Sequence, residues 1–171
     1  MSFKHIPFGS PEGFNAIVEI PRGSSNKYEL DEELDAIKLD WVFPESFKLP
    51  FDYGCIPQTR GGDGDALDVY ILNQHPLTIG TIVLCRPIGI IKTLDRGEVD
   101  DKIFAIPIAN HHYEKYQDIA DLDFDYNNLF VNFFKELGVQ KNKKIEGKGF
   151  FGRQEALAEL KKSHAHFLAG K

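Results

Sequence analysis

Short apolar segments, each bounded by Pro, Gly or Asp, recur between residues 16 and 108 and most constrain the fold of this chain. They span residues 16–20, 27–30, 67–72, 81–86, 88–93 and 102–108. Segments this short, separated by turn residues, are typical of β-strands. Many short strands at such spacing favour a closed or nearly closed barrel.

Helical periodicity appears only after these segments. Apolar residues recur at the i, i+3, i+4 steps of an amphipathic helix, at Tyr126, Leu129, Phe130, Phe133, Phe134 and Leu137. A second helix is predicted from about residue 153 to residue 168, ending near Gly170. The predicted class is therefore α+β, mainly β, with two main helices.

Length and composition point to a single compact unit. A chain of 171 residues, 42% hydrophobic and without internal repeats or a linker, predicts one domain over residues 1–171. No apolar run approaches the ~18 residues that a membrane span requires, and the N-terminal residues lack a basic segment followed by an apolar one. We therefore expect a cytoplasmic protein without a membrane partner.

Charge and cysteine content exclude further classes. The formal net charge of -6 argues against a nucleic-acid partner, because phosphate neutralisation by Lys and Arg dominates such binding. An anionic substrate would need local cations. Cys55 and Cys85 lie in apolar or turn surroundings without a CxxC pairing, which predicts two buried reduced thiols.

The stretch Gly61-Gly62-Asp63-Gly64-Asp65-Ala66-Leu67-Asp68 places three carboxylates at the entrance to a predicted strand. Two unit charges 4 Å apart in water repel by about 1 kcal/mol, and by more in a drier site. A compensating cation is therefore expected, and hard divalent metals such as magnesium prefer such oxygens. A solvated acidic turn is the alternative. A calcium-binding helix pair is excluded, because the sixth position is Asp68 and the twelfth is Gln74.

A second acidic cluster spans residues 95–102 and contains Asp95 and Asp100. Taken alone, it is typical of a charged hairpin tip. A barrel, however, brings loops from one rim together, and two facing carboxylate groups can hold two metals about 3.5–4 Å apart for in-line attack on phosphorus.

Basic and hydroxyl side chains near these clusters have two interpretations each. Lys27 and Glu29 share one strand face near Glu19, which fits either an ordinary surface ladder or a barrel mouth where Lys27 holds a phosphoryl oxygen. Lys102 and Lys135 could serve in the same way. Tyr53 is either a buried tyrosine with a backbone partner or a hydrogen-bond donor in the site.

The sequence does not support a dinucleotide-binding, phosphate-loop, serine-hydrolase or zinc-binding motif. Residues 147–152 match the GxGxxG spacing, but only 19 residues follow and no second strand fits. There is no GxxxxGK[ST] or GxSxG motif. His111-His112 and His164-Ala165-His166 lack partners at zinc spacing.

Across about residues 14–150 the chain resembles the soluble, magnesium-dependent inorganic pyrophosphatases that form a barrel. The segment Asp63-Gly64-Asp65-Ala66-Leu67-Asp68-Val69 is similar to the DxDPxD signature of that family, with Ala66 where Pro is usual. Supporting matches are Val18-Glu19-Ile20-Pro21, Lys27-Tyr28-Glu29, Pro50-Phe51-Asp52-Tyr53-Gly54, Cys85-Arg86-Pro87-Ile88-Gly89, Asp95, Asp100, Lys102 and Lys135.

This resemblance implies a five-stranded, OB-like β-barrel flanked by helices, which hydrolyses pyrophosphate to two phosphates. Asp65 would be the base that deprotonates the attacking water. The implied metal ligands and supporting carboxylates are Asp63, Asp68, Asp95, Asp100, Glu19 and Glu29. Lys27, Lys102 and Lys135 would hold phosphate oxygens, with Tyr53 as a hydrogen-bond donor. Several magnesium ions are implied, with manganese or cobalt as substitutes, and bacterial relatives commonly form homohexamers.

Two positions depart from the family pattern. Trp41 stands where the family has Arg, and Phe134 stands where it has Tyr. Loss of an arginine hydrogen bond costs roughly 1.5–3 kcal/mol, against the ~8–23 kcal/mol by which enzymes lower barriers. We therefore expect metal-centred catalysis to persist. Our hypothesis is that Arg60 partly replaces the missing arginine, with Arg22 as the weaker candidate.

The sequence is also compatible with two alternatives to a hydrolase. One is a catalytically weakened phosphate- or metal-binding protein on the same barrel, motivated by Trp41 and Phe134. The other is an oligonucleotide- or oligosaccharide-binding barrel that uses its exposed aromatic residues, although the net charge of -6 disfavours nucleic acid. Magnesium-supported turnover separates the first alternative from the hydrolase.

Overall fold

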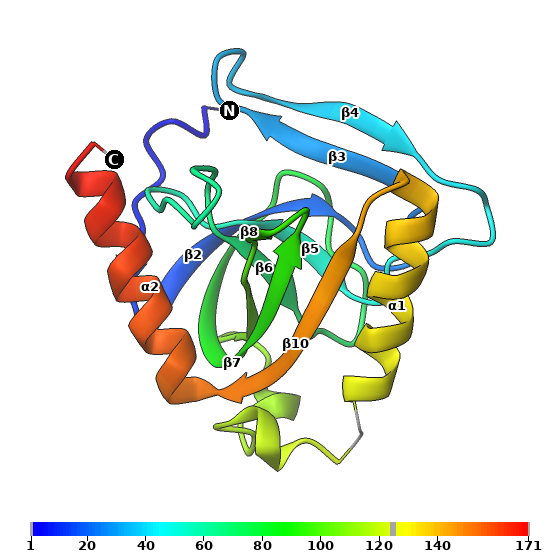
Figure 1. Ribbon diagram of the computed structural model, residues 1–171. Helices are drawn as coiled ribbons and strands as arrows, with labels where there is room; N and C mark the ends of the chain where they lie inside the picture. The colour runs from blue at the N-terminus through cyan, green and yellow to red at the C-terminus, as the bar shows by residue number, and fades with distance from the viewer. Residues whose placement is uncertain (1, 124–125, 171) are drawn as a thin grey trace.

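The computed structural model describes residues 2–123 and 126–170 and is mainly β, with two long helices (Figure 1). The strands are β1 (Gly9–Ser10), β2 (Gly13–Ile20), β3 (Asn26–Asp31), β4 (Ala36–Val42), β5 (Asp52–Cys55), β6 (Asp68–Ile71), β7 (Ile82–Asp95), β8 (Glu98–Val99), β9 (Lys102–Pro107) and β10 (Ile145–Gly152). The helices are η1 (His111–Tyr113), η2 (Ile119–Asp121), α1 (Tyr126–Lys141) and α2 (Arg153–Leu168).

Five strands close a hydrogen-bonded ring. Their order is β2-β5-β6-β9-β7, and β7 pairs back onto β2. The β6–β9 pair is parallel, and the others are antiparallel. Strand β10 adds to the outer side of β7, while β3 and β4 form a separate two-stranded sheet above the ring (Figure 1). The predicted mainly-β class with two helices is confirmed.

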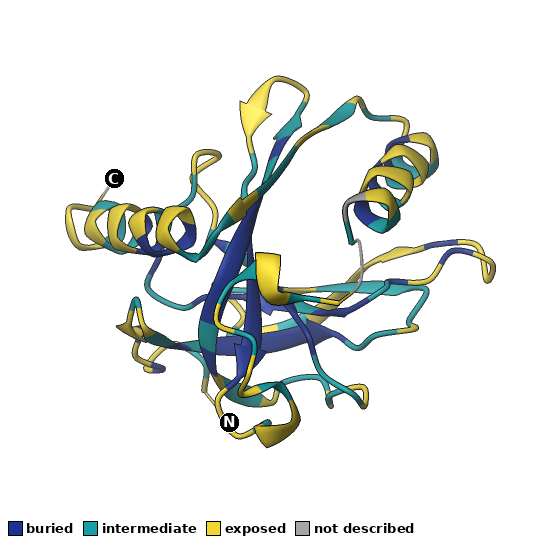
Figure 2. Ribbon diagram, turned by 90° about the horizontal axis from the view of Figure 1, so that it is seen from below, coloured by how far each residue is buried: buried dark blue, intermediate teal, exposed yellow. Residues whose placement is uncertain are grey.

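The side chains of the ring strands contribute to two apolar cores, one on each face of the sheet. Successive side chains of a strand point to opposite faces, so neighbouring residues enter different cores. Val69 and Ile71 of β6 belong to one core, which also contains Leu160 of α2. Tyr70 of β6 belongs to the other, together with Phe104 of β9. Figure 2 shows the buried strands between the helices, whose outer faces are exposed.

Helix α1 covers the second core with the face that the sequence predicts. Phe130 is 1% exposed and stacks on Phe51, with ring centroids 5.2 Å apart. Phe134 is 3% exposed and stacks on Phe130. Aromatic pairs of this kind add about 0.5–1.5 kcal/mol beyond the burial of area, which fixes α1 against the ring.

The structure differs from the sequence prediction at several strands. The predicted segments 81–86 and 88–93 form a single strand, β7, because a register shift between Pro87 and Gly89 accommodates a proline that lacks an N–H donor. Strands β1, β4, β5, β8 and β10 were not predicted. Both cysteines are buried and free, as predicted. None of the described helices combines the length and apolar composition needed to cross a membrane.

Candidate active site

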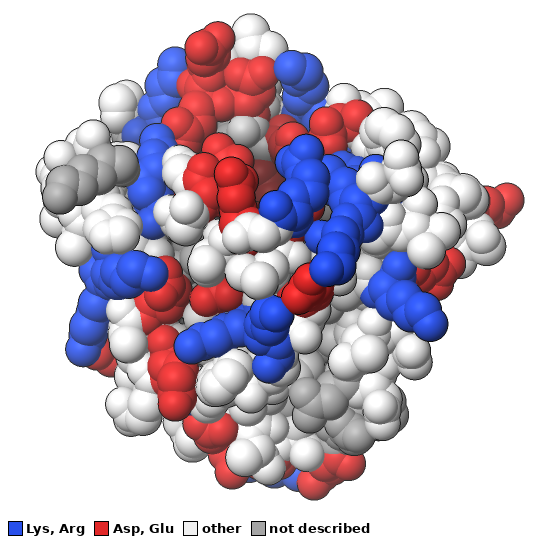
Figure 3. Space-filling model, in the orientation of Figure 1, with Lys and Arg blue, Asp and Glu red and all other residues white. Residues whose placement is uncertain are grey.

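A cleft of about 570 Å³ opens at one end of the ring, between the β3–β4 sheet and α1. All the predicted site residues line it except Lys135. Figure 3 looks onto this face, where Asp and Glu side chains gather in a hollow and Lys and Arg side chains border them on the side of α1. The cleft is therefore divided into an acidic part and a basic margin.

The loop between β5 and β6 carries Asp63 and Asp65 into the cleft. Gly64 has φ +90°, a left-handed conformation that L side chains rarely adopt, and the turn closes when Asp63 Oδ1 accepts the backbone N–H of Asp65 at 3.1 Å. The base of the loop is fixed by buried Thr59, whose hydroxyl accepts the backbone N–H of Leu67 at 2.9 Å. Local turn chemistry thus sets the spacing of the two carboxylates.

Lys102 bridges two of the predicted metal ligands. Its Nζ lies 2.7 Å from Asp68 Oδ2 and 2.6 Å from Asp100 Oδ1. Burial disfavours the charge on Lys102, but Asp68 and Asp100 outweigh this effect and raise its pKa above the ordinary value. Burial also raises the pKa of Asp100 to about 6, against the opposing effect of Lys102.

Glu19 is a buried carboxylate at the end of β2, with 5% of its surface exposed. It accepts the backbone N–H of Leu30 at 2.7 Å. Burial raises the pKa of Glu19 to about 7, despite this hydrogen bond. The buried charge would be stabilised by a cation in the cleft.

Tyr53 projects from β5 on the side of Asp68. Burial, followed by the negative charge of Asp68, raises the pKa of Tyr53 well above its ordinary value. The hydroxyl therefore stays protonated and can donate a hydrogen bond. Tyr53 also lines the cleft.

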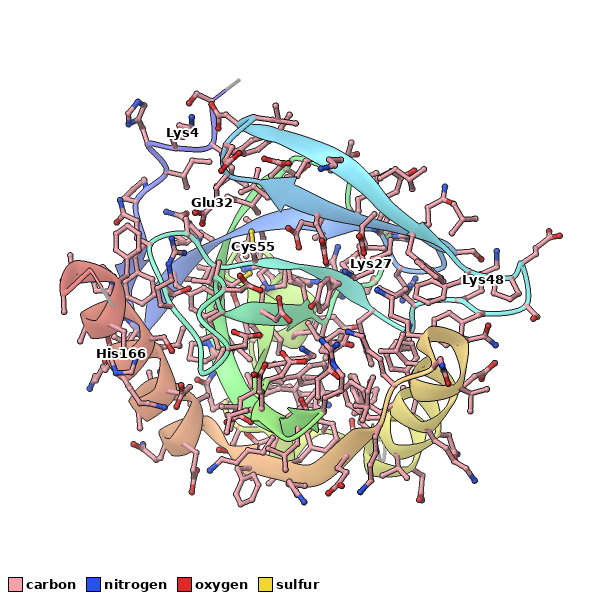
Figure 4. The ribbon with its side chains drawn as sticks, turned by 45° about the horizontal axis from the view of Figure 1, so that its top comes forward. Lys4, Lys27, Glu32, Lys48, Cys55 and His166 are labelled. Atoms are coloured by element: carbon pink, nitrogen blue, oxygen red, sulfur yellow. The ribbon has the colours of Figure 1, made fainter. Side chains whose placement is uncertain are left out.

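Lys27 and Glu29 are in contact on the face of β3 that lines the cleft, as their spacing predicts. Lys27 Nζ also lies 2.9 Å from Oδ2 of Asp40 on β4. Figure 4 shows Lys27 between the β3–β4 sheet and the ring, Cys55 on ring strand β5, and Lys48 on the loop after β4. The β3–β4 sheet thus supplies a cation to the cleft.

Asp95, at the end of β7, brings the second acidic cluster to the same cleft as the first. Lys143 Nζ lies 2.8 Å from its Oδ2. Its Oδ1 is buried and, among the described residues, accepts no hydrogen bond, with Arg96 Nε 3.4 Å away. The long ion pair with the 67% exposed Arg96 leaves this oxygen able to bind an additional cation.

Arg60 lines the cleft but is held by an acidic partner. Its guanidinium donates to Glu32 Oε1 at 3.1 Å and to Glu32 Oε2 at 3.0 Å, and it lies over the Phe167 ring at 5.4 Å. Arg22 donates to the backbone oxygens of Asn73 and Gln74 and does not line the cleft. The structure therefore gives neither arginine a free guanidinium in the cleft.

Lys135 is the predicted site residue that the structure places elsewhere. It is exposed on α1 and does not line the cleft, because the inward face of the helix carries Phe134 and Leu137. The prediction overlooked Lys141 and Lys143, which do line the cleft. The helical periodicity could have indicated Lys141, since it follows Leu137 by four residues and Phe134 by seven.

The cleft suits a hard divalent cation. Among the described residues its acidic side chains outnumber its basic ones, and Asp95 Oδ1 accepts no hydrogen bond. Carboxylate oxygens are ligands that magnesium prefers. In residues 2–123 and 126–170, no three Asp, Glu, His or Cys side chains are placed to hold a metal ion. Lys102 instead occupies the space between Asp68 and Asp100.

The sequence is similar to a known family and to several of its members. A family model described as inorganic pyrophosphatase matches residues 16–168. An inorganic pyrophosphatase from Saccharolobus solfataricus is 41% identical over 159 residues, covering 90% of this chain and 91% of that protein. One from Thermus thermophilus is 36% identical over 171 residues, covering 97% and 98%.

The fold is also similar to solved structures of inorganic pyrophosphatases. The crystal structure of inorganic pyrophosphatase from Thermus thermophilus superposes with a TM-score of 0.90 at 35% identity, covering 98% of this chain and 99% of that one. An inorganic pyrophosphatase from Neisseria gonorrhoeae gives 0.86 at 31% identity, covering 96% and 98%. Fold, cleft and sequence together show that this chain belongs to the inorganic pyrophosphatase family.

Proposed function

We propose that the cleft hydrolyses pyrophosphate to two orthophosphates through attack of a magnesium-activated water. The observation that carries this proposal is the meeting, in one cleft, of carboxylates from two separate acidic clusters with lysines from β3 and β9. A tetra-anionic substrate needs the lysines, and closely spaced carboxylates need divalent cations. Membership of the inorganic pyrophosphatase family supports the same activity.

Asp65 is the proposed general base. Burial, followed by the charges of Asp63 and Asp68, raises the pKa of Asp65 above its ordinary value. A carboxylate with a raised pKa accepts a proton more readily, which suits it to take the proton of the attacking water. Magnesium, when bound, lowers the pKa of its water and neutralises charge on the phosphates.

The remaining carboxylates are the proposed holders of the metal ions. Asp63, Asp68, Asp95 and Asp100 would be ligands, supported by Glu19 and Glu29. Manganese or cobalt could substitute for magnesium, since both accept oxygen ligands. Calcium is expected to inhibit, because its coordination is longer and more flexible; equal turnover with calcium and magnesium would contradict this expectation.

Lys27, Lys102 and Tyr53 are the proposed substrate-binding groups. Lys27 lines the cleft and would bind a phosphoryl oxygen, and Lys102 lies between Asp68 and Asp100. The protonated hydroxyl of Tyr53, which lines the cleft, would donate a hydrogen bond to substrate. Arg60 would reach substrate only after release from Glu32.

Phosphate release tests the function. The intact chain, freed of metal with EDTA, is mixed with pyrophosphate and titrated with magnesium. The expected result is release of two phosphates per pyrophosphate that depends on magnesium. Phosphate binding without any release would instead favour the weakened binding protein motivated by Trp41 and Phe134.

Two further proposals concern architecture. The ring would be an OB-like barrel, which is supported by its five strands and by the parallel pairing of β6 with β9, the third and fifth ring strands in chain order. The chain would form homo-oligomers, which is supported by exposed Val131 and Val139 on α1. Light scattering tests the second proposal, and a mass six times that of one chain would match the expected hexamer.

A further inference from the structure

Lys141 is the last residue of α1 and lies at the margin of the cleft, opposite β4. Its side chain is 16% exposed and lines the cleft. The Lys141 ammonium lies over the Trp41 ring, 5.5 Å from the ring centroid, and 3.5 Å from Asp40 Oδ2. A cation at this distance from an indole face is attracted by the ring, so Trp41 restrains Lys141 without using its hydrogen-bonding capacity.

The polar contact of Lys141 is loose. Charge-assisted hydrogen bonds between ammonium and carboxylate are usually about 2.7–2.9 Å long, and Asp40 is already bound by Lys27 at 2.9 Å. An ammonium has three donors, and the contact with Asp40 uses one of them. Lys141 therefore keeps donor capacity toward the cleft.

Most of the other cations of the cleft are more firmly held, whereas Arg96, 3.4 Å from Asp95, is 67% exposed. Lys102 and Lys143 lie 2.6–2.8 Å from carboxylates, and Arg60 is bound at two points by Glu32. Burial, followed by the nearby charge of Lys27, lowers the pKa of Lys141. An anion bound between Lys27 and Lys141 would relieve the repulsion between the two lysines.

We propose that Lys141 is a phosphate-binding residue of this cleft, held in place by the Trp41 ring, and that it rather than Arg60 supplies the cation that Trp41 itself cannot. This inference rests on the proposed function and names a further residue for the same site. Substrate would exchange the long contact with Asp40 for a direct one with a phosphate oxygen. Trp41 is then a positioning residue that acts through Lys141.

The test uses Lys141→Met, which keeps the apolar stem against Trp41 and removes the charge. Lys48→Met is the matched control, because Lys48 is exposed on the loop after β4 and lies outside the cleft (Figure 4). Binding of inorganic phosphate is measured by calorimetry at fixed magnesium, and KM and kcat for pyrophosphate are measured in parallel. Thermal melting checks that both variants fold.

Lys141→Met is expected to weaken phosphate binding about ten- to a hundredfold, as loss of a hydrogen bond to a charged group does. Lys141→Arg should recover most of the binding, and Trp41→Leu should weaken it less than Lys141→Met. Lys48→Met should leave it unchanged. If Lys141→Met binds phosphate as Lys48→Met does, the inference is wrong.

Failure of the proposed function would be distinguishable from failure of this inference. An intact chain that releases no phosphate from pyrophosphate refutes the hydrolase. The calorimetric titration still decides whether Lys141 binds phosphate, because it requires no turnover. A melting temperature lowered by Lys141→Met alone, with phosphate affinity unchanged, would make Lys141 a structural residue at the helix terminus and overturn the inference.

Discussion

The Nζ atom of Lys102 lies 2.7 Å from Oδ2 of Asp68, and the two residues are direct partners in the parallel pairing of β9 with β6. The strand pairing that closes the ring is therefore the same contact that assembles the cleft. The side chain of Lys102 is 7% exposed, so its charge is compensated almost entirely by protein carboxylates. Fold stability and site geometry are coupled at this pair.

Removal of the Lys102 charge should destabilise the metal-free protein. Lys102→Met leaves Asp68 and Asp100 facing each other without a cation, and loss of one partner of a buried pair costs about 3–5 kcal/mol. Urea unfolding in EDTA measures this loss, and added magnesium should restore part of it. A loss no greater than that of the exposed Lys48→Met would contradict the coupling.

Stability of the metal-free protein should also depend on Glu19 and pH. The folded-state pKa of Glu19 is raised from 4.5 to about 7 by burial, so folding favours its protonated form. The stability that the protonated carboxyl contributes is fully present below pH 4.5 and is lost as the pH rises through 7. Glu19→Gln should therefore be more stable than the parent by up to about 3 kcal/mol at pH 8.

The pH comparison is the decisive part of this prediction. At pH 5 the stability gained by Glu19→Gln should shrink to less than about 1 kcal/mol, because most of the native carboxyl is then protonated in the folded state. Unfolding in EDTA at pH 5 and pH 8 measures the gap. Glu12→Gln, at an exposed carboxyl, is the control. An equal gap at both pH values would refute the assignment to Glu19.

Gly64 should matter for turnover beyond its effect on stability. It has φ +90°, and an added Cβ would meet nothing within 4 Å, so Gly64→Ala introduces conformational strain of about 1–2 kcal/mol without a clash. Gly23, with φ +83° and the same free space, is the matched control outside the cleft. Both variants should lose similar stability, but only Gly64→Ala should lose turnover, because it displaces Asp63 and Asp65. Equal turnover in the two variants would show that the loop conformation is not catalytically important.

Much of the fold was predictable because its signals are local. Short apolar segments bounded by turn residues identified β2, β3, β6 and β9, and the aromatic periodicity identified α1. Strand β4 was not predicted, because most of its residues are exposed and it pairs with β3 alone among the described strands. It therefore has no alternating buried face. Strand β10 was not predicted, because Gly147 and Gly149 at its register shift are residues that disfavour a strand in the sequence pattern.

The site was predictable where residues lie on loops and strands with a fixed spacing, as Asp63, Asp65 and Asp68 do. It was not predictable where a long-range contact decides which cation enters the cleft. The position of Lys135 followed from similarity to a motif, whereas the rotation of α1 turns Lys135 outward and Lys141 inward. The binding of Arg60 by Glu32, 28 residues earlier, likewise left no signal in the sequence.

The most direct test of the account is phosphate release from pyrophosphate by Asp65→Asn, compared with the parent chain and with Asp123→Asn, at the same magnesium concentration. Asp123 is an exposed aspartate outside the cleft, which makes its variant a matched control. Loss of the general base should lower kcat about 10²–10⁴-fold in Asp65→Asn alone, with its melting temperature retained. Turnover by Asp65→Asn equal to that of Asp123→Asn would contradict the assignment of the base and the mechanism built on it.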